Sequence, residues 1–159
     1  MTTMFSPFQA GVLELRHRIV LAPMSRYRCT SQMAPHSLTA EYYAQRASPG
    51  GLLITEATHI NPEGTPVWNI YPEIRDHGGE SPGIWTEEQT AAYRQVVDKV
   101  HARGAYISCQ LQHCGRVAQE DIKDHPLVKG GNFPIGPVSA SAVSIRASAE
   151  EGNHYNWDQ

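Results

Sequence analysis

Alternation of short apolar runs with segments of helical periodicity limits the folds open to this chain more than any other feature. The apolar runs cover residues 19–24, 51–57 and 105–111. One helical segment begins at Ser37 and ends before Pro49, and the other begins at Thr86 and ends at Gly104. A strand–helix–strand–helix–strand order is typical of parallel βαβ units with right-handed crossovers. The sequence therefore predicts an α/β fold built on parallel strands.

Local signals refine this prediction. Ser37 is a candidate N-cap for the first helix, and residues 86–89 carry a Thr-Glu-Glu-Gln capping box for the second. Alternation of apolar and polar residues over 13–20 predicts a short antiparallel element that leads into the first apolar strand. The tail after Gly115 has no sustained periodicity, and we expect loops there with a short strand around 137–144.

The length of the chain limits how many strand–helix units it can contain. The chain has 159 residues, which favours one domain. A closed (β/α)₈ barrel typically takes about 250 residues. We therefore expect residues 1–159 to form a single incomplete TIM-barrel domain, with about the first three βα units, an N-terminal hairpin and a loop-rich tail.

Composition excludes several classes of function. Charged residues make up 18% of the chain and the net charge is -3, so no basic surface for nucleic acid is expected. The apolar runs are too short to cross a bilayer, and the first residues lack a secretory signal. The sequence therefore predicts a cytoplasmic protein that binds neither nucleic acid nor membrane.

Cysteines do not indicate a disulfide framework or a metal site. The three cysteines are Cys29, Cys109 and Cys114, an odd number typical of free thiols. Cys109, His113 and Cys114 lie close in sequence, but their spacing matches no common zinc pattern and a fourth ligand is missing. We expect no metal.

Five sequence blocks, in the same order, resemble the old yellow enzyme family. They are Leu21–Arg26, Glu41–Ala47, Ile54–Ala57, Gly83–Gln89 and Gln110–Arg116. The resemblance implies a (β/α)₈ barrel that holds FMN at the carboxyl ends of its strands. It also implies reduction of activated carbon–carbon double bonds with NAD(P)H, and hence a small-molecule alkene as substrate.

Candidate cofactor-binding residues lie at the C-terminal ends of the three apolar runs. Ser25, Ala57 and Gln110 lie where the predicted strands end, which is where barrel enzymes build their sites. By resemblance, Pro23, Met24 and Ser25 lie along the flavin, with the Ser25 hydroxyl near O4 and N5. The Ala57 N–H would meet the pyrimidine edge, and the Gln110 amide would meet N3 and O2. Taken alone, Ser25 also suits a turn, and a strand glutamine also suits pairing with neighbouring backbone.

Tyr27 is the candidate catalytic residue. It matches an active-site tyrosine of one branch of the family, although a tyrosine after a barrel strand also suits packing beneath a loop. His113, Gly115 and Arg116 are expected to fix the loop after the third strand rather than to take part in chemistry.

Other expected residues have no counterpart in this sequence. Alkene-reducing members carry a His-x-x-Asn or His-x-x-His pair after the fourth strand, and His154-Tyr155-Asn156 does not match it. The proton-donating tyrosine and the glycine and arginine of the phosphate site would come later in a full-length member. We therefore expect a truncated or divided form that lacks tight FMN binding and reductase activity by itself.

Three hypotheses follow. The chain is the N-terminal part of an ene-reductase, completed by a C-terminal half. Alternatively, it is a shortened relative recruited as a non-redox isomerase or cyclase. As a third alternative, it is a non-catalytic assembly or binding module that associates with itself or a partner through exposed strand edges.

Overall fold

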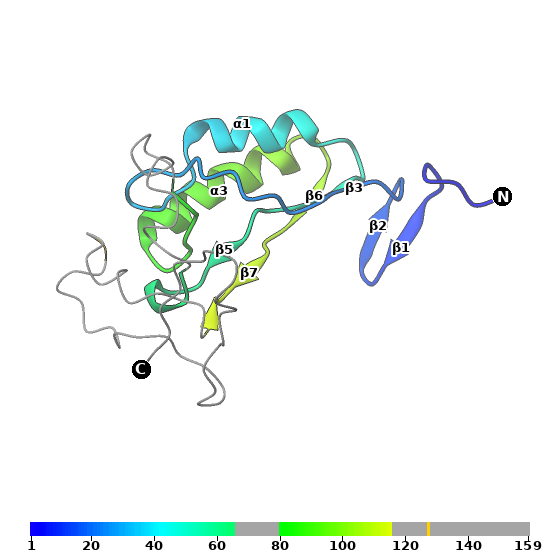
Figure 1. Ribbon diagram of the computed structural model, residues 1–159. Helices are drawn as coiled ribbons and strands as arrows, with labels where there is room; N and C mark the ends of the chain where they lie inside the picture. The colour runs from blue at the N-terminus through cyan, green and yellow to red at the C-terminus, as the bar shows by residue number, and fades with distance from the viewer. Residues whose placement is uncertain (66–79, 116–126, 128–159) are drawn as a thin grey trace, which may run out of the picture.

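The computed structural model describes residues 1–65, 80–115 and 127. Two helices and several short strands follow one another along the described chain (Figure 1). In order, the elements are β1 (Phe8–Ala10), β2 (Leu13–Leu15), β3 (Val20–Leu21), α1 (Ser37–Arg46), β4 (Leu52–Ile54), β5 (Thr58–His59), the 3₁₀ helix η1 (Pro62–Gly64), α3 (Glu87–His101), β6 (Tyr106–Ser108) and β7 (Leu111–Gln112).

A parallel sheet in the order β3-β4-β6 lies at the centre, as the alternation of elements predicts. Leu21 pairs with Leu53, and Leu53 pairs with Ile107. Within the described residues, α1 lies in the crossover from β3 to β4, and α3 lies in the crossover from β4 to β6. The carboxyl ends of all three strands therefore lie at the same edge of the sheet.

The predicted strands are shorter than the apolar runs that suggested them. The first ends at Leu21, because Pro23 has no N–H to donate to a ladder. The other two are interrupted and resume as a second parallel pair, β5 with β7. At the interruption, Gln110 donates its backbone N–H to the Thr55 Oγ1 at 3.0 Å, so a side chain replaces a backbone acceptor.

Both predicted helices are present, and they lie side by side over one face of the sheet (Figure 1). The capping box of α3 is confirmed, with Thr86 and Gln89 bonded reciprocally. Ser37 as the N-cap of α1 was wrong. His36 holds that position, and its Nδ1 accepts the Leu38 N–H at 3.2 Å.

The apolar core fills the space between these helices and the sheet. Leu53, at the middle of β4, is 1% exposed and belongs to a buried cluster with residues of both helices. Leu21 and Ile107, its partners in the neighbouring strands, pack against the same cluster. The helix-facing side of the sheet is therefore one continuous apolar layer.

An antiparallel hairpin precedes the sheet, which confirms the short antiparallel element expected from the sequence. β1 pairs with β2, and Gly11 takes a φ of 60° at the turn between them. The hairpin projects from the end of the molecule nearest the N-terminus (Figure 1). The guanidinium of Arg18 lies 4.6 Å from the centroid of the Phe8 ring and braces the hairpin against the following chain.

The opposite face of the sheet carries apolar side chains that helices do not cover. Val20 is exposed, while its partner Leu52, and Tyr106 that pairs with Leu52, are only half-buried. Among the described residues, β3 and β6 each pair with one strand only. The three parallel strands thus form an open sheet within the described chain, while the predicted tail strand lies outside the described residues.

No helix in the described part of the chain combines the length and apolar character that a membrane span requires.

We expect Leu53→Ala to lower the free energy of unfolding by about 2 to 5 kcal/mol, because it leaves a cavity in the layer between sheet and helices. Urea denaturation followed by circular dichroism measures this change. Leu38→Ala in α1 is the matched control, because Leu38 is 70% exposed and should lose little stability. Equal losses in the two variants would contradict this assignment of the core.

Candidate functional site

The structure brings the predicted cofactor-binding residues to one edge of the sheet. Ser25, Ala57 and Gln110 follow β3, β4 and β6 at the carboxyl ends of these strands. Ser25, Met24 and Gln110 are exposed, whereas Pro23 and Ala57 are half-buried. The edge therefore offers a small, accessible polar surface next to the methionine and proline side chains.

Three polar groups at this edge are unused by the described protein. Within the described residues, no hydrogen bond involves the Ser25 hydroxyl, the Ala57 N–H or the Gln110 carboxamide. The backbone of Gln110 is nevertheless fixed at both ends, since its N–H binds Thr55 and its carbonyl accepts the Thr58 N–H at 2.9 Å. Gln110 thus presents a free carboxamide from a fixed backbone, and the alternative of backbone pairing does not hold among these residues.

Glu56 lies directly behind this edge, and its importance was missed in the sequence analysis. Its side chain is buried, with the residue only 2% exposed, and its Oε2 accepts the Arg26 N–H at 2.8 Å. The Tyr27 backbone also hydrogen-bonds this carboxylate. Burial raises the pKa of Glu56, while these two backbone hydrogen bonds and the Arg26 guanidinium act in the opposite direction. A charged residue within an apolar run was the available signal.

Tyr27, the predicted catalytic residue, lies in the loop after β3 with an uncommon backbone conformation. Its φ is 50°, in the left-handed region that a bulky side chain seldom adopts. The backbone of Arg26 and that of Tyr27 itself are both directed to the Glu56 carboxylate. The side chain is half-buried. Tyr27 is thus held by its backbone next to the strand-end surface.

Hydrogen bonds from three hydroxyl groups fix the backbone of Glu56. Thr55 and Thr58 each donate their Oγ1 hydrogen to the Glu56 carbonyl at 2.9 Å. The Tyr43 hydroxyl in α1 accepts the Glu56 N–H at 2.8 Å. Thr58 is also bonded to the Tyr93 hydroxyl in α3 at 2.5 Å. Both helices therefore reach the interrupted strand through aromatic side chains that combine an apolar ring with a polar end.

Burial also controls the ionisation of these tyrosines. Desolvation raises the pKa of Tyr43 to about 12, and it raises the pKa of Tyr93 as well. Both phenols are therefore protonated near neutral pH and act as uncharged hydrogen-bonding groups.

The side chain of Arg26 points away from the strand ends into contact with α1. Its guanidinium lies 3.6 Å from the centroid of the Tyr42 ring, and that of Arg46 lies 3.7 Å from the same centroid. Two guanidinium groups this close to one centroid must occupy opposite faces of the ring. This cation–π stack anchors the loop after β3 to the helix.

The turn η1 and the chain after β7 hold each other in place. The His113 ring packs where a side chain on Gly64 would lie, since an added Cβ there would be 2.5 Å from its Cδ2. Cys114 donates its N–H to the Gly64 carbonyl at 2.8 Å, and Gly115 donates to the His113 Nδ1 at 2.9 Å. These contacts agree with the expected role of His113 and Gly115 in fixing the loop, while Arg116 lies outside the described residues.

His59, at the end of β5, is a buried and neutral histidine. It is 1% exposed, and its Nδ1 has no hydrogen-bond partner among the described residues. Desolvation lowers its pKa from 6.5 to about 4; a hydrogen bond with the Gly64 backbone opposes this shift, and the nearby His113 ring adds to it. Folding at neutral pH therefore places an uncharged imidazole beneath the site.

The cysteines are all unpaired thiols, as expected. Cys29 is buried, and desolvation raises its pKa, as it also does for Cys114. Cys109 is exposed. Across residues 1–65 and 80–115, no group of three or more histidine, cysteine or acidic side chains is arranged to hold a metal ion.

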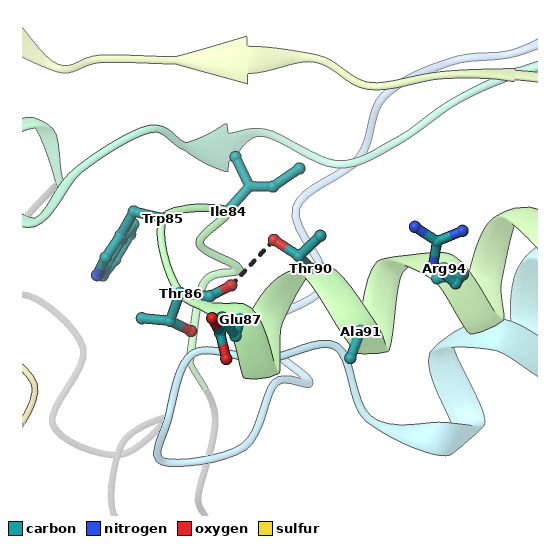
Figure 2. Close-up of a pocket in the computed structure, with 7 residues that line it drawn as sticks. All are labelled: Ile84, Trp85, Thr86, Glu87, Thr90, Ala91 and Arg94. Carbon is teal, nitrogen blue, oxygen red and sulfur yellow. Dashed lines mark hydrogen bonds between the residues drawn. The ribbon is translucent and has the colours of Figure 1, made fainter.

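A hollow of about 410 Å³ lies at the N-terminus of α3 (Figure 2). It is lined by Ile84, Trp85, Thr86, Glu87, Thr90, Ala91 and Arg94. The Thr90 hydroxyl donates a hydrogen bond to the Thr86 carbonyl at 2.9 Å, at the start of the helix. None of the strand-end residues lines this hollow, so the hollow is separate from the sheet edge where the candidate site lies.

Comparison with known proteins gives consistent matches. A family model described as the NADH:flavin oxidoreductase / NADH oxidase family matches residues 3–155. An NADP-dependent oxidoreductase from Aspergillus flavus is 38% identical over 148 residues, which are 92% of this chain and 34% of that protein. A chanoclavine-I aldehyde reductase from Penicillium roqueforti is 40% identical over 162 residues, covering 99% of this chain and 40% of that protein.

A solved structure is similar as well. The old yellow enzyme homologue from Zymomonas mobilis matches with a TM-score of 0.65 and 36% identity, over 77% of this chain and 31% of that one. The chain thus spans about a third of the length of the relatives it matches.

We expect His59 to make stability depend on pH. Because its pKa is about 4 when folded and 6.5 ordinarily, the unfolded chain binds a proton that the folded chain does not between these values. Above pH 6.5, His59 does not lower the free energy of unfolding. As the pH falls from 6.5 toward about 4, protonation of His59 in the unfolded chain lowers the free energy of unfolding by about 3 kcal/mol.

Urea denaturation at several pH values measures this slope in the wild type and in His59→Gln. The slope should become shallower in His59→Gln and should persist in His101→Gln, whose histidine is exposed at the end of α3. Glu56 titrates in all three proteins, so its contribution cancels in the comparison. Identical slopes would show that His59 is protonated without cost in the folded protein.

Proposed function

Because this chain belongs to the NADH:flavin oxidoreductase / NADH oxidase family, which includes the old yellow enzymes, we propose that it serves in an FMN-dependent reductase of activated carbon–carbon double bonds. FMN and a nicotinamide nucleotide are the cofactors of this family, as the sequence led us to expect. The chain itself would contribute the flavin-facing ends of three strands.

One observation carries the proposal. The unused hydroxyl of Ser25, N–H of Ala57 and carboxamide of Gln110 are placed at one edge of a parallel sheet. An isoalloxazine ring has acceptors and a donor along its pyrimidine edge, and a carboxamide supplies the complementary acceptor and donors. The number and kind of these groups fit a flavin, and the position after parallel strands is typical of cofactor sites.

Each residue has a distinct role in this proposal. When bound, FMN supplies hydride transfer between the nicotinamide nucleotide and the alkene. Gln110 binds N3 and O2, the Ala57 N–H binds the pyrimidine edge, and Ser25 hydrogen-bonds near O4 and N5. Pro23 and Met24 exclude water along the ring. Each of these contacts orients the ring or adjusts how readily it accepts electrons.

We place the Tyr27 side chain on the substrate side of the flavin. Its left-handed backbone and half-buried side chain support a held position next to Ser25. A phenol there is a hydrogen-bond donor and acceptor for a substrate oxygen. The substrate class we propose is a small molecule whose alkene is activated by a carbonyl, and the aldehyde in the name of one relative supports the carbonyl part of that class.

We also propose that further protein covers the open face of the sheet. The exposed Val20 and Leu111 lie on strands that pair on one side only among the described residues. Apolar surface of this kind favours association, at roughly 25 cal/mol per Å² removed from water. The partner is either a C-terminal half that continues the barrel or a second copy of this chain.

If a C-terminal half restores FMN binding, we expect Gln110→Leu to weaken that binding by about 1 to 3 kcal/mol, because polar atoms of the ring edge lose their partner. FMN titration followed by ¹H–¹⁵N NMR on the labelled 159-residue chain, with that half present, measures affinity and locates the site together. The Gln110 carboxamide and the Ala57 amide should shift in the wild type. Gln95→Leu, at an exposed position of α3, is the matched control and should bind FMN normally. An unchanged affinity in Gln110→Leu would remove this residue from the site.

Association should depend on the edge strands. Sedimentation velocity over a hundredfold concentration range should show a mass that rises above one chain. Leu111→Lys should suppress this rise, because Leu111 is 62% exposed on β7 and a charge opposes burial there. Leu38→Lys, on the exposed side of α1, should not suppress it. A single-chain mass at every concentration would contradict self-association and leave the C-terminal half as the proposed partner.

A further inference from the structure

We propose that Glu56 is a positioning residue, whose buried carboxylate holds the Arg26 and Tyr27 amides and thereby fixes the loop after β3 in its flavin-facing conformation. This inference rests on the proposed function, because it concerns how the same site is kept in place. Nothing in the comparisons assigns a role to this residue.

Geometry places Glu56 between two candidate cofactor contacts. Its Oε2 lies 2.8 Å from the Arg26 nitrogen, and Arg26 directly follows Ser25. On the other side, Glu56 directly precedes Ala57. One side-chain contact therefore joins the neighbours of two residues that are 32 positions apart in the chain, and it sets the spacing between the Ser25 hydroxyl and the Ala57 N–H.

Regular secondary structure does not hold the loop in this region. Residues 22–28 form no helix or strand, and the Pro23 ring cannot donate to the sheet. The side chain of Arg26 is committed to the Tyr42 ring. The Glu56 carboxylate, which follows β4 in the chain, is thus the group that directs the backbone of Arg26 and Tyr27, and the loop continues from there with a left-handed φ of 50° at Tyr27.

The chemistry of the contact explains why a carboxylate occupies this buried position. Both partners of the side chain are N–H donors, and a carboxylate accepts through both oxygens and donates nothing. Glutamine would replace one oxygen by an NH₂ group that cannot accept an N–H. Burial at 2% exposure disfavours a charged carboxyl group, and the backbone hydrogen bonds offset part of that cost.

Glu56 is itself rigidly held, which a positioning residue requires. Tyr43 binds its N–H, and Thr55 and Thr58 bind its carbonyl. These contacts connect it to α1, and to α3 through Tyr93. Through Glu56, the packed core therefore fixes the position of the loop after β3, and the residues that flank the loop do not have to do so.

The test compares Glu56→Gln with Tyr43→Phe, which removes a hydrogen bond to the backbone of the same residue and leaves the carboxylate in place. Amide hydrogen exchange is measured first, without FMN. We expect Glu56→Gln to lower the protection of the Arg26 and Tyr27 amides by about tenfold, equivalent to about 1.4 kcal/mol. Tyr43→Phe should lower overall stability but leave these two amides protected relative to the rest of the protein.

FMN titration by NMR is the second measurement on the same proteins. Glu56→Gln should reduce FMN affinity about tenfold and abolish the FMN-induced shift of the Ser25 amide, while Tyr43→Phe keeps that shift. Unchanged exchange in Glu56→Gln, or equal local losses in both variants, overturns the positioning role. No FMN effect on the wild type when a C-terminal half is present overturns the proposed function instead, and the exchange data then still decide whether Glu56 holds the loop.

Discussion

The contact between the Glu56 carboxylate and the backbone after β3 is the constraint on which the strand-end surface depends. Three strands of two or three residues each define only the direction of the chain at this edge. A further contact must therefore set the conformation of the loop beyond these strands. The buried Glu56 side chain, which accepts hydrogen bonds from two backbone groups of the loop, supplies that contact. Directional hydrogen bonds to a charge specify a conformation more narrowly than apolar contact does.

Aromatic side chains make that arrangement compatible with an apolar core. Tyr43 and Tyr93 bury their rings among core residues and direct their hydroxyl groups to the interrupted strand. Each hydroxyl satisfies a backbone or threonine group that would otherwise be buried without a partner. Helix packing and site geometry are therefore coupled, because the same two residues take part in both.

Function in this family resides in groups at the strand ends, and the fold alone does not establish it. The family assignment rests on matches across most of the chain, which spans about a third of each relative. The described residues place three polar groups at one edge of the sheet and leave its opposite face without a covering helix. The proposed flavin site and the proposed covering protein both follow from these two features.

The sequence by itself determined the alternation of three parallel strands with two helices, because periodicity and capping signals are local, and the family resemblance singled out Ser25, Ala57 and Gln110 at the strand ends. It did not reveal where the strands break, the N-cap at His36 or the role of Glu56. Those features depend on contacts between residues far apart in the chain, such as Thr55 with Gln110 and Glu56 with Arg26. Only tertiary packing brings such pairs together and buries them, and burial decides which polar groups bind each other.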